Sequence, residues 1–141
     1  MKIEIIMIGK ISDRPYKDII ELYLKRCSKR ISVSIINCRN ANEAFKRISN
    51  KSVIIGLDEH SKCRNTMEFT KWLDVKIKNG VNNVVFCLGA AAGLDNRIKE
   101  KATELMSLSP LTMNHQLALL VLAEQLYRSV SIMSGGPYHK A

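Results

Sequence analysis

The stretch that decides the fold of this chain is VVFCLGAAAGLD, residues 84–95. Its first half is a short apolar run, which is typical of a strand buried on both faces of a parallel sheet. Gly89 and Gly93 follow, and glycine permits positive φ angles and a close approach of the backbone to a ligand. The spacing matches neither the dinucleotide-binding GxGxxG pattern nor a P-loop. On these residues alone, a turn into a helix with Asp95 as its N-cap explains the loop equally well.

The remainder of the chain alternates between the same two patterns. Apolar or β-branched runs predict strands at 3–9, 31–37, 52–57 and 83–88, and apolar residues at helical spacing predict helices at 16–28, 41–48, 67–77 and 116–133. Pro15 suits a first helical turn, and Gly80 suits the end of a helix. Such alternation implies right-handed crossovers and a parallel sheet covered on both faces. With 141 residues and no linker or repeat, we predict one α/β domain over 1–141 with a Rossmann-like sheet.

The composition is that of a globular protein, with 46% hydrophobic and 25% charged residues. No segment approaches the roughly 18 apolar residues of a membrane span. The opening MKIEIIMIGK contains Glu4 and lacks a small-residue cleavage site, so we expect a first strand here and not a signal peptide. We therefore expect no membrane partner.

The four cysteines are widely spaced, with no CxxC and no histidine at metal-ligand spacing. This pattern predicts neither a zinc site nor a redox pair, and we expect no metal. Small buried hydrophobes in a reducing cytoplasm are the simplest interpretation of Cys27, Cys38, Cys63 and Cys87.

A net charge of +9 and an isoelectric point near 9.6 are large for this length. Such a field attracts polyanions because their condensed counterions are released on binding. Nucleic acid is therefore the leading partner, although a generally basic proteome would raise the charge in the same way.

The predicted last helix, 116–133, is apolar over more of its surface than one face against a sheet requires. This suggests burial against another subunit. A central core helix in a monomer explains the pattern equally well.

Ligands of open parallel sheets bind beyond the carboxyl ends of the strands. Three such ends carry candidate groups: 57–59, 89–95 and the irregular stretch 107–115, where Asn114 suits the cap of the last helix. Near the end of the sequence, GGPYHK (135–140) combines turn residues with an aromatic ring, a titratable ring and a cation. Together with Arg128, this tail could stack on a base, handle a proton and contact phosphate.

Four segments carry a resemblance to a known family: VVFCLGAAAGL (84–94), SLSPLTMNH (107–115), LAEQLYRSVSIM (122–133) and PYHK (137–140). They resemble the SPOUT methyltransferases of the ribosomal RNA large subunit methyltransferase H family, over nearly the whole chain. The resemblance implies a methyltransferase dependent on S-adenosyl-L-methionine that acts on N3 of a pseudouridine in helix 69 of large-subunit rRNA, in the ribosome.

The resemblance also implies an architecture: a trefoil knot in the C-terminal half and a homodimer with an active site shared between subunits. It implies that backbone groups of three loops bind S-adenosyl-L-methionine. The residues that supply these groups would be Leu57, Gly89, Leu108, Ser109, Pro110, Leu111, Thr112 and Met113. In two places this chain differs from the family pattern. It has GAAAG at 89–93 in place of GGxxG, and Leu119 in place of an arginine.

For the chemistry we expect His139 nearest the loss of the N3 proton, as a base or by orienting a water, with Tyr138 against the uracil. Arg128 and Lys140 would hold phosphate or stabilise the developing anion. His115 would help to position the RNA, and Glu124 would also position the site, although a helix cap and an interface ion pair explain these two equally well.

Two other hypotheses remain at this point. A ribosome-binding or RNA-binding module could keep the fold with weakened or lost cofactor-dependent activity, and titration with S-adenosyl-L-methionine would reveal it. A flavodoxin-like binder of small molecules would leave the charge of +9 unexplained.

Overall fold

A computed structural model describes residues 1–27, 30–48, 51, 53–90 and 93–140. The elements are β1 (Lys2–Ile8), α1 (Arg14–Arg26), β2 (Ser32–Cys38), α2 (Ala41–Ile48), β3 (Ile54–Leu57), α3 (Thr66–Lys78), β4 (Asn83–Leu88), α4 (Asn96–Lys101), β5 (Glu104–Met106) and α5 (His115–Met133). All pairings are parallel, and the strand order is β2-β1-β4-β3-β5. The predicted parallel α/β sheet is confirmed.

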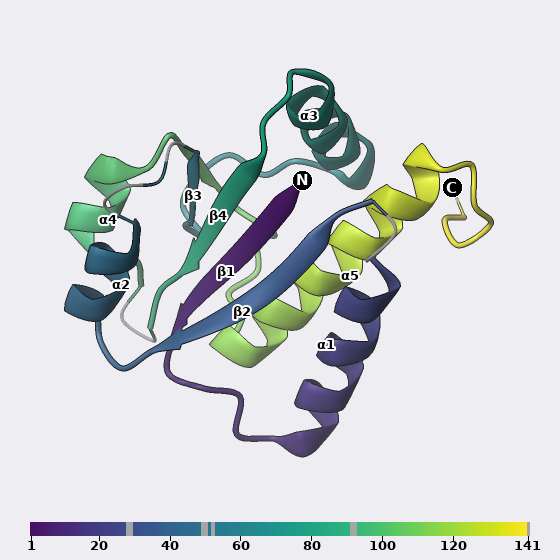
Figure 1. Cartoon of the computed structure of the whole chain (residues 1–141). Helices are drawn as coiled ribbons and strands as arrows, with labels where there is room; N and C mark the ends of the chain where they lie inside the picture. Colours follow the sequence, from purple (N-terminus) through teal and green to yellow (C-terminus); the bar gives the residue numbers. More distant parts are fainter. Residues whose placement is uncertain (28–29, 49–50, 52, 91–92, 141) are drawn as a thin grey trace.

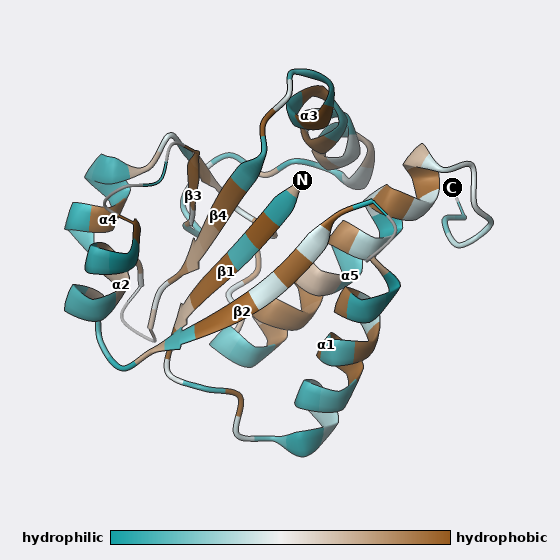
Figure 2. Ribbon diagram, viewed as in Figure 1, coloured by the Kyte–Doolittle hydropathy of each residue, from teal (hydrophilic) through white to brown (hydrophobic). Residues whose placement is uncertain are grey.

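The sheet is the middle of three layers (Figure 1). On one face, α1, α3 and α5 pack against Ile3, Ile5 and Phe86, and on the other α2 and α4 pack against Ile6 and Val85. Adjacent residues of one strand therefore enter different cores, which is why the central strands are apolar over most of their length, in β1 from Ile5 to Ile8 and in β4 from Val84 to Leu88 (Figure 2).

Several local predictions are confirmed. Pro15 lies in the first turn of α1, although this helix begins at Arg14, two residues earlier than predicted. Gly80 follows the end of α3 with φ +77°. Asp95 caps α4, because its side chain accepts a hydrogen bond from the backbone N–H of Arg97 at 2.9 Å. The predicted turn from the 89–93 loop into a helix is therefore confirmed. The predicted end of the first helix, Ser28, and two residues of the GAAAG loop, Ala91 and Ala92, lie outside the described residues.

The sequence did not predict β5. This strand has three residues, and it pairs with β3 from Ile55 opposite Glu104 to Leu57 opposite Met106. A polar residue and two apolar ones carry no recognisable period, so only the pairing with β3 defines the strand.

The cysteine prediction is confirmed for three side chains: Cys27, Cys38 and Cys87 are buried, while Cys63 is half-buried. Burial raises the pKa of the Cys27 and Cys87 thiols to about 12. Both therefore stay protonated and unreactive at neutral pH.

Candidate active site

The tail after α5 is set by two glycines. Gly135 has φ +71° and donates to the carbonyl of Ile132, and Gly136 donates to the carbonyl of Ser131 at 2.8 Å. These two bonds form a Schellman motif, which ends a helix and reverses the chain. A Cβ on Gly136 would lie 2.7 Å from the Ser131 Oγ and 3.3 Å from the Ser131 carbonyl oxygen, so a larger residue would have to displace the Ser131 side chain. The predicted turn therefore returns Tyr138 and His139 to the side of α5.

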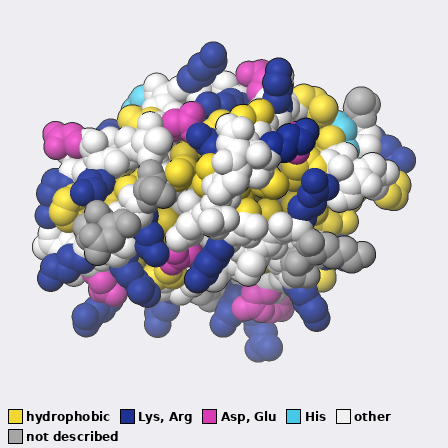
Figure 3. All heavy atoms as spheres, turned by 45° about the horizontal axis from the view of Figure 1, so that its top comes forward, with side chains coloured by type: hydrophobic (Ala, Val, Ile, Leu, Met, Phe, Trp, Pro, Cys, Tyr) yellow, Lys and Arg dark blue, Asp and Glu magenta, His cyan; other side chains and the backbone are white. Residues whose placement is uncertain are grey.

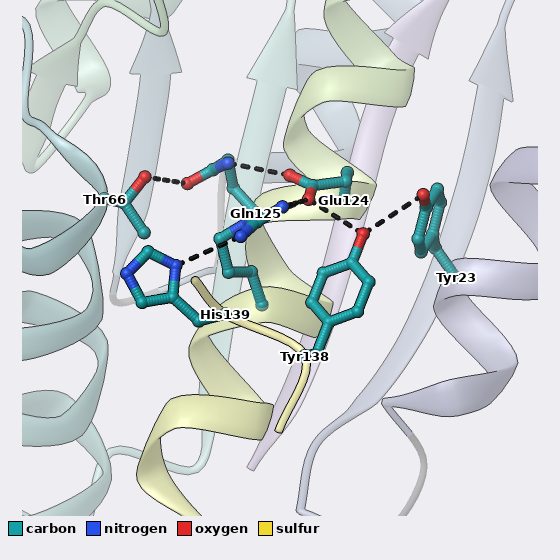
Figure 4. Close-up of polar contacts among 7 residues, drawn as sticks. Tyr23, Thr66, Glu124, Gln125, Tyr138 and His139 are labelled. Atoms are coloured by element: carbon teal, nitrogen blue, oxygen red, sulfur yellow. Dashed lines mark hydrogen bonds and ion pairs between the residues drawn. The ribbon is translucent and has the colours of Figure 1, made fainter. Parts of the chain in front are cut away.

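Glu124 is the centre of the polar cluster that results (Figure 4). Its Oε1 accepts from Arg128 Nη2 at 2.6 Å, from Arg128 Nε at 2.9 Å and from the Tyr138 hydroxyl at 3.0 Å. Its Oε2 accepts from Gln125 at 2.7 Å, and Thr66 donates to Gln125 at 2.9 Å. Glu124 thus forms an ion pair within α5 of the same chain, and its hydrogen bond from Tyr138 attaches the tail to this helix.

Arg128 links the carboxylate to the histidine. Its Nη1 lies 3.0 Å from Nδ1 of His139, and its guanidinium lies 4.7 Å from the centre of the Tyr138 ring. The hydrogen bonds to Glu124 raise the pKa of Arg128. The guanidinium is therefore a fixed cation that holds both tail side chains.

Tyr138 packs between the aromatic rings of Tyr127 and Tyr23 and the polar side chains of the Glu124 cluster. Its ring centre lies 4.6 Å from that of Tyr127, and its hydroxyl lies 3.2 Å from the hydroxyl of Tyr23 on α1. Burial is the main cause that raises the pKa of Tyr138, and the hydrogen bonds with Tyr23 and Glu124 raise it further. The phenol therefore stays neutral and can donate hydrogen bonds but cannot act as a base.

The residues predicted to bind the cofactor lie at the carboxyl ends of three strands. Leu57 is the last residue of β3, Gly89 follows β4, and the loop from Leu108 to Met113 follows β5; these three strands are neighbours in the sheet. A Cβ on Gly89 would lie 2.4 Å from the carbonyl oxygen of Gly93, and Gly93 itself has φ +95°. Glycine is thus required at both positions by the turn itself.

The loop from 107 to 114 is held by its own polar groups. Ser107 Oγ donates to the carbonyl of Ser109 at 2.8 Å, and Ser109 Oγ accepts from the N–H of Leu111 at 3.0 Å. Asn114 caps α5, as predicted, by accepting from the N–H of Leu117 at 2.9 Å. The Leu111 side chain is 74% exposed, which leaves apolar surface at the ends of the strands.

A pocket of about 320 Å³ lies between the start of α3 and the middle of α5. Leu108 and Ser107 form one wall, Phe69 and Val121 are apolar lining residues, and Gln125 connects the pocket to the Glu124 cluster. It is the size of a small-molecule site.

The structure brings Arg128, Tyr138 and His139 together, but His115 lies away from them. His115 begins α5, thirteen residues before Arg128, which at about 1.5 Å per residue separates the two by roughly 20 Å. Lys140 is exposed beside the tail cluster. Leu119, where the family pattern has an arginine, is fully buried in the core, so this position points into the fold and not toward a ligand.

Tyr23, Gln125 and Thr66 belong to the cluster but were not predicted. Tyr23 lies on the apolar face of α1, which predicted only core packing, and its contact with Tyr138 joins residues far apart in the sequence. No local pattern could have indicated it.

Within the described ranges, no helix is long and apolar enough to cross a membrane. Those same ranges hold no group of three or more histidine, cysteine or acidic side chains placed to bind a metal ion.

The family model described as "Predicted SPOUT methyltransferase" matches residues 1–139. Two solved structures share the fold: a probable methylase family protein from Haemophilus influenzae (TM-score 0.62, 12% identity, 99% of this chain and 70% of that one) and a probable methyltransferase from Bordetella pertussis (TM-score 0.59, 14% identity, 91% and 95%). The chain therefore belongs to the SPOUT methyltransferase family, whose cofactor is S-adenosyl-L-methionine.

Individual relatives are similar over their full length. Ribosomal RNA large subunit methyltransferase H of Streptococcus uberis is 36% identical, over 99% of this chain and 100% of that protein. The protein of the same name from Syntrophomonas wolfei is 33% identical, again over 99% and 100%. The resemblance stated from the sequence is confirmed.

Proposed function

We propose that this protein methylates large-subunit ribosomal RNA in the cytoplasm, at N3 of a pseudouridine in helix 69. The names of its relatives support the ribosomal RNA substrate, and the resemblance of the sequence motifs implies the nucleotide. The observation that carries the proposal is the cluster in which Glu124 and Arg128 hold Tyr138 and His139 in fixed positions. A base-stacking ring, a titratable ring and a cation at one place suit a flipped or unpaired nucleotide.

The charge of the protein supports an RNA substrate. The net charge is +9, and on the face in Figure 3 Lys and Arg side chains spread across the surface and project from its edge. Lys140 extends this positive surface to the tail. Such a distribution favours contact with an RNA backbone over a wide area.

S-adenosyl-L-methionine would lie at Leu57, Gly89 and the residues from Leu108 to Met113. The exposed side chain of Leu111 and the half-buried side chains of Leu57 and Leu108 offer apolar surface for an adenine ring, and loop backbone groups can bond its edges. When bound, the cofactor supplies an electrophilic methyl group on a sulfonium.

We propose that the C-terminal half is knotted and that two copies share each active site. The fold is compatible with the knot because β5 follows β4 in the chain but lies outside β3, so that the segment before α5 starts beside the loop after β3. Ser107 indeed donates to the carbonyl of Lys62 in that loop at 3.1 Å.

The apolar surface of α5 supports the dimer. Within one chain, the third predicted cofactor loop ends at Asn114, which caps the first turn of α5, whereas the tail packs beside Glu124 and Arg128 further along the helix. A second copy can bring its tail to these loops, and half-buried apolar residues of α5 remain for its docking: Leu117, Ala118, Leu120, Val121 and Tyr127.

In the complete site, Tyr138 would pack against the uracil, Lys140 would contact phosphate, and His115 near the cofactor loops would position the RNA. A water-excluded, positioned site favours the transfer because it brings the N3 anion and the sulfonium together and neutralises both charges.

The test is incubation of the purified protein with labelled S-adenosyl-L-methionine and ribosomes that lack this methylation, followed by mapping of the label. We expect label on the helix 69 pseudouridine, lost in His139→Ala and kept in His60→Ala, whose side chain is 83% exposed. Label at another nucleotide would refute the substrate, and no label would refute the activity.

Complementation tests the shared site separately. Two inactive variants, His139→Ala and Gly89→Arg, are mixed under conditions that exchange subunits. If the site is shared, each mixed dimer has one intact site, so roughly a quarter of the wild-type activity returns. Two variants that stay inactive together despite forming mixed dimers would rule out sharing.

A further inference from the structure

The contact between Arg128 and His139 restricts what the histidine can do. A guanidinium has only donors and remains protonated in proteins. At 3.0 Å from Arg128 Nη1, His139 Nδ1 must therefore be the acceptor. A neutral imidazole with a lone pair at Nδ1 carries its proton at Nε2.

Several other contacts of Arg128 keep its hydrogen bond to His139 Nδ1 in place. Two bonds to Glu124, at 2.6 and 2.9 Å, fix the guanidinium, and its face lies 4.7 Å from the centre of the Tyr138 ring. The Tyr138 hydroxyl bonds the same carboxylate oxygen. Rotation of Arg128 would therefore disrupt the attachment of the whole tail.

We propose that Arg128 locks His139 as the neutral Nε2–H tautomer, and that His139 donates a hydrogen bond to a carbonyl oxygen of the target base and does not remove its proton. This rests on the proposed function of the tail. The one basic lone pair of the ring is occupied by Arg128, while Nε2 points away from it (Figure 4). Arg128 is then a positioning residue, and His139 is the catalytic one.

The chemistry is balanced without a basic side chain. Hydroxide from the solvent takes the N3 proton of the uracil ring and becomes water. The negative charge spreads over N3 and its two neighbouring carbonyl oxygens, one of which accepts from His139 Nε2. N3 then bonds the methyl carbon as the carbon–sulfur bond breaks, and sulfur keeps the electron pair as a neutral thioether. The hydrogen bond from His139 is strongest when the oxygen is most negative, so it favours the anion.

The tautomer is measured directly by long-range ¹H–¹⁵N NMR on the full chain labelled at histidine. We expect one ring with a protonated Nε2 and an unprotonated Nδ1, absent from the spectrum of His139→Gln. His60 and His115 serve as internal references, and Arg128→Met should return His139 to the ordinary mixture of tautomers. A proton on Nδ1, or a mixture in the wild-type protein, would overturn the proposal.

Single-turnover methylation of ribosomes separates a donor from a base. The Gln side chain can place an N–H near the position of Nε2 but cannot accept the proton. For a donor, His139→Gln should keep the rate within about tenfold, while His139→Ala loses roughly 100-fold or more. His139→Asn, which reaches only to the position of Nδ1, should lose as much as alanine.

Equal losses in the Gln and Ala variants would assign the base role to His139 and overturn the proposal. A wild-type protein that transfers no methyl group would instead overturn the proposed function and the substrate side of this inference, while the NMR spectrum would still decide the tautomer.

Discussion

Replacing Glu124 by Gln removes one negative charge from the centre of the tail cluster while keeping the shape of the side chain. Three hydrogen bonds end on its Oε1, two from Arg128 and one from Tyr138. A glutamine keeps one oxygen that can accept these three bonds. Its NH2 group, in place of Oε2, can donate to Gln125 once the Gln125 amide turns over and donates to the Thr66 hydroxyl. The change therefore tests the charge and not the packing. We expect a less stable protein with a loosened tail.

The magnitude follows from those three bonds. Hydrogen bonds to a charged group contribute about 1.5–3 kcal/mol and neutral ones about 1 kcal/mol, so each bond weakens by roughly 1 kcal/mol. The sum of about 3 kcal/mol is an upper limit, because the Glu124 and Arg128 side chains are 20% and 23% exposed and water screens the pair. We expect the free energy of unfolding to fall by about 1–2 kcal/mol, or about 3–6 °C in Tm.

Urea denaturation followed by the fluorescence of Trp72, the single tryptophan, measures global stability, and hydrogen exchange of 135–140 measures tail attachment. Asp18→Asn is the matched control, because its ion pair with Arg14 is also four residues apart but spans 3.9 Å between side chains 67% and 90% exposed. The control should change stability by less than about 0.5 kcal/mol.

The reasoning would be refuted if Glu124→Gln matched Asp18→Asn in stability and the tail amides exchanged at the wild-type rate. That result would mean that aromatic packing alone holds the tail.

Three further perturbations test other parts of the structure. Leu119→Arg, which introduces the family's arginine, should destabilise the fold by more than about 3 kcal/mol in urea denaturation, because it buries an unpaired charge, whereas Leu119→Met should cost less than about 1.5 kcal/mol; a stable arginine variant would contradict the burial of this position. Gly89→Ala should weaken S-adenosyl-L-methionine binding in calorimetric titration and cost about 1–3 kcal/mol of stability, because its Cβ meets the carbonyl of Gly93; wild-type binding would show that the turn can adjust. Since burial raises the pKa of the Cys87 thiol from 9.0 to about 12, its ionisation favours the unfolded chain above pH 9, so stability should fall as the pH rises from 9 toward 12; the decline should be smaller in Cys87→Ala, and an unchanged decline would assign it to other groups.

The sequence by itself determined much of the sheet and its helices. The central strands were predictable because burial on both faces makes the whole run apolar, and the ends of helices were predictable at Asp95 and Asn114 because an N-cap bonds a backbone group only two or three residues away. The turn at Gly89 and Gly93 was also predictable, because a glycine's freedom to adopt a positive φ or a close backbone approach is a local property of the residue. The family motifs placed both halves of the candidate site.

Only the tertiary structure decided how these parts are related. β5 exists because it pairs with β3, and Tyr23 joins the tail through a contact 115 residues away in sequence. The protonation of His139 depends on which nitrogen Arg128 reaches, and Leu119 is a core residue because of how α5 meets the sheet. Local periodicity records which face of an element is buried, but it does not record which distant group the face meets, and that pairing arranges the candidate site.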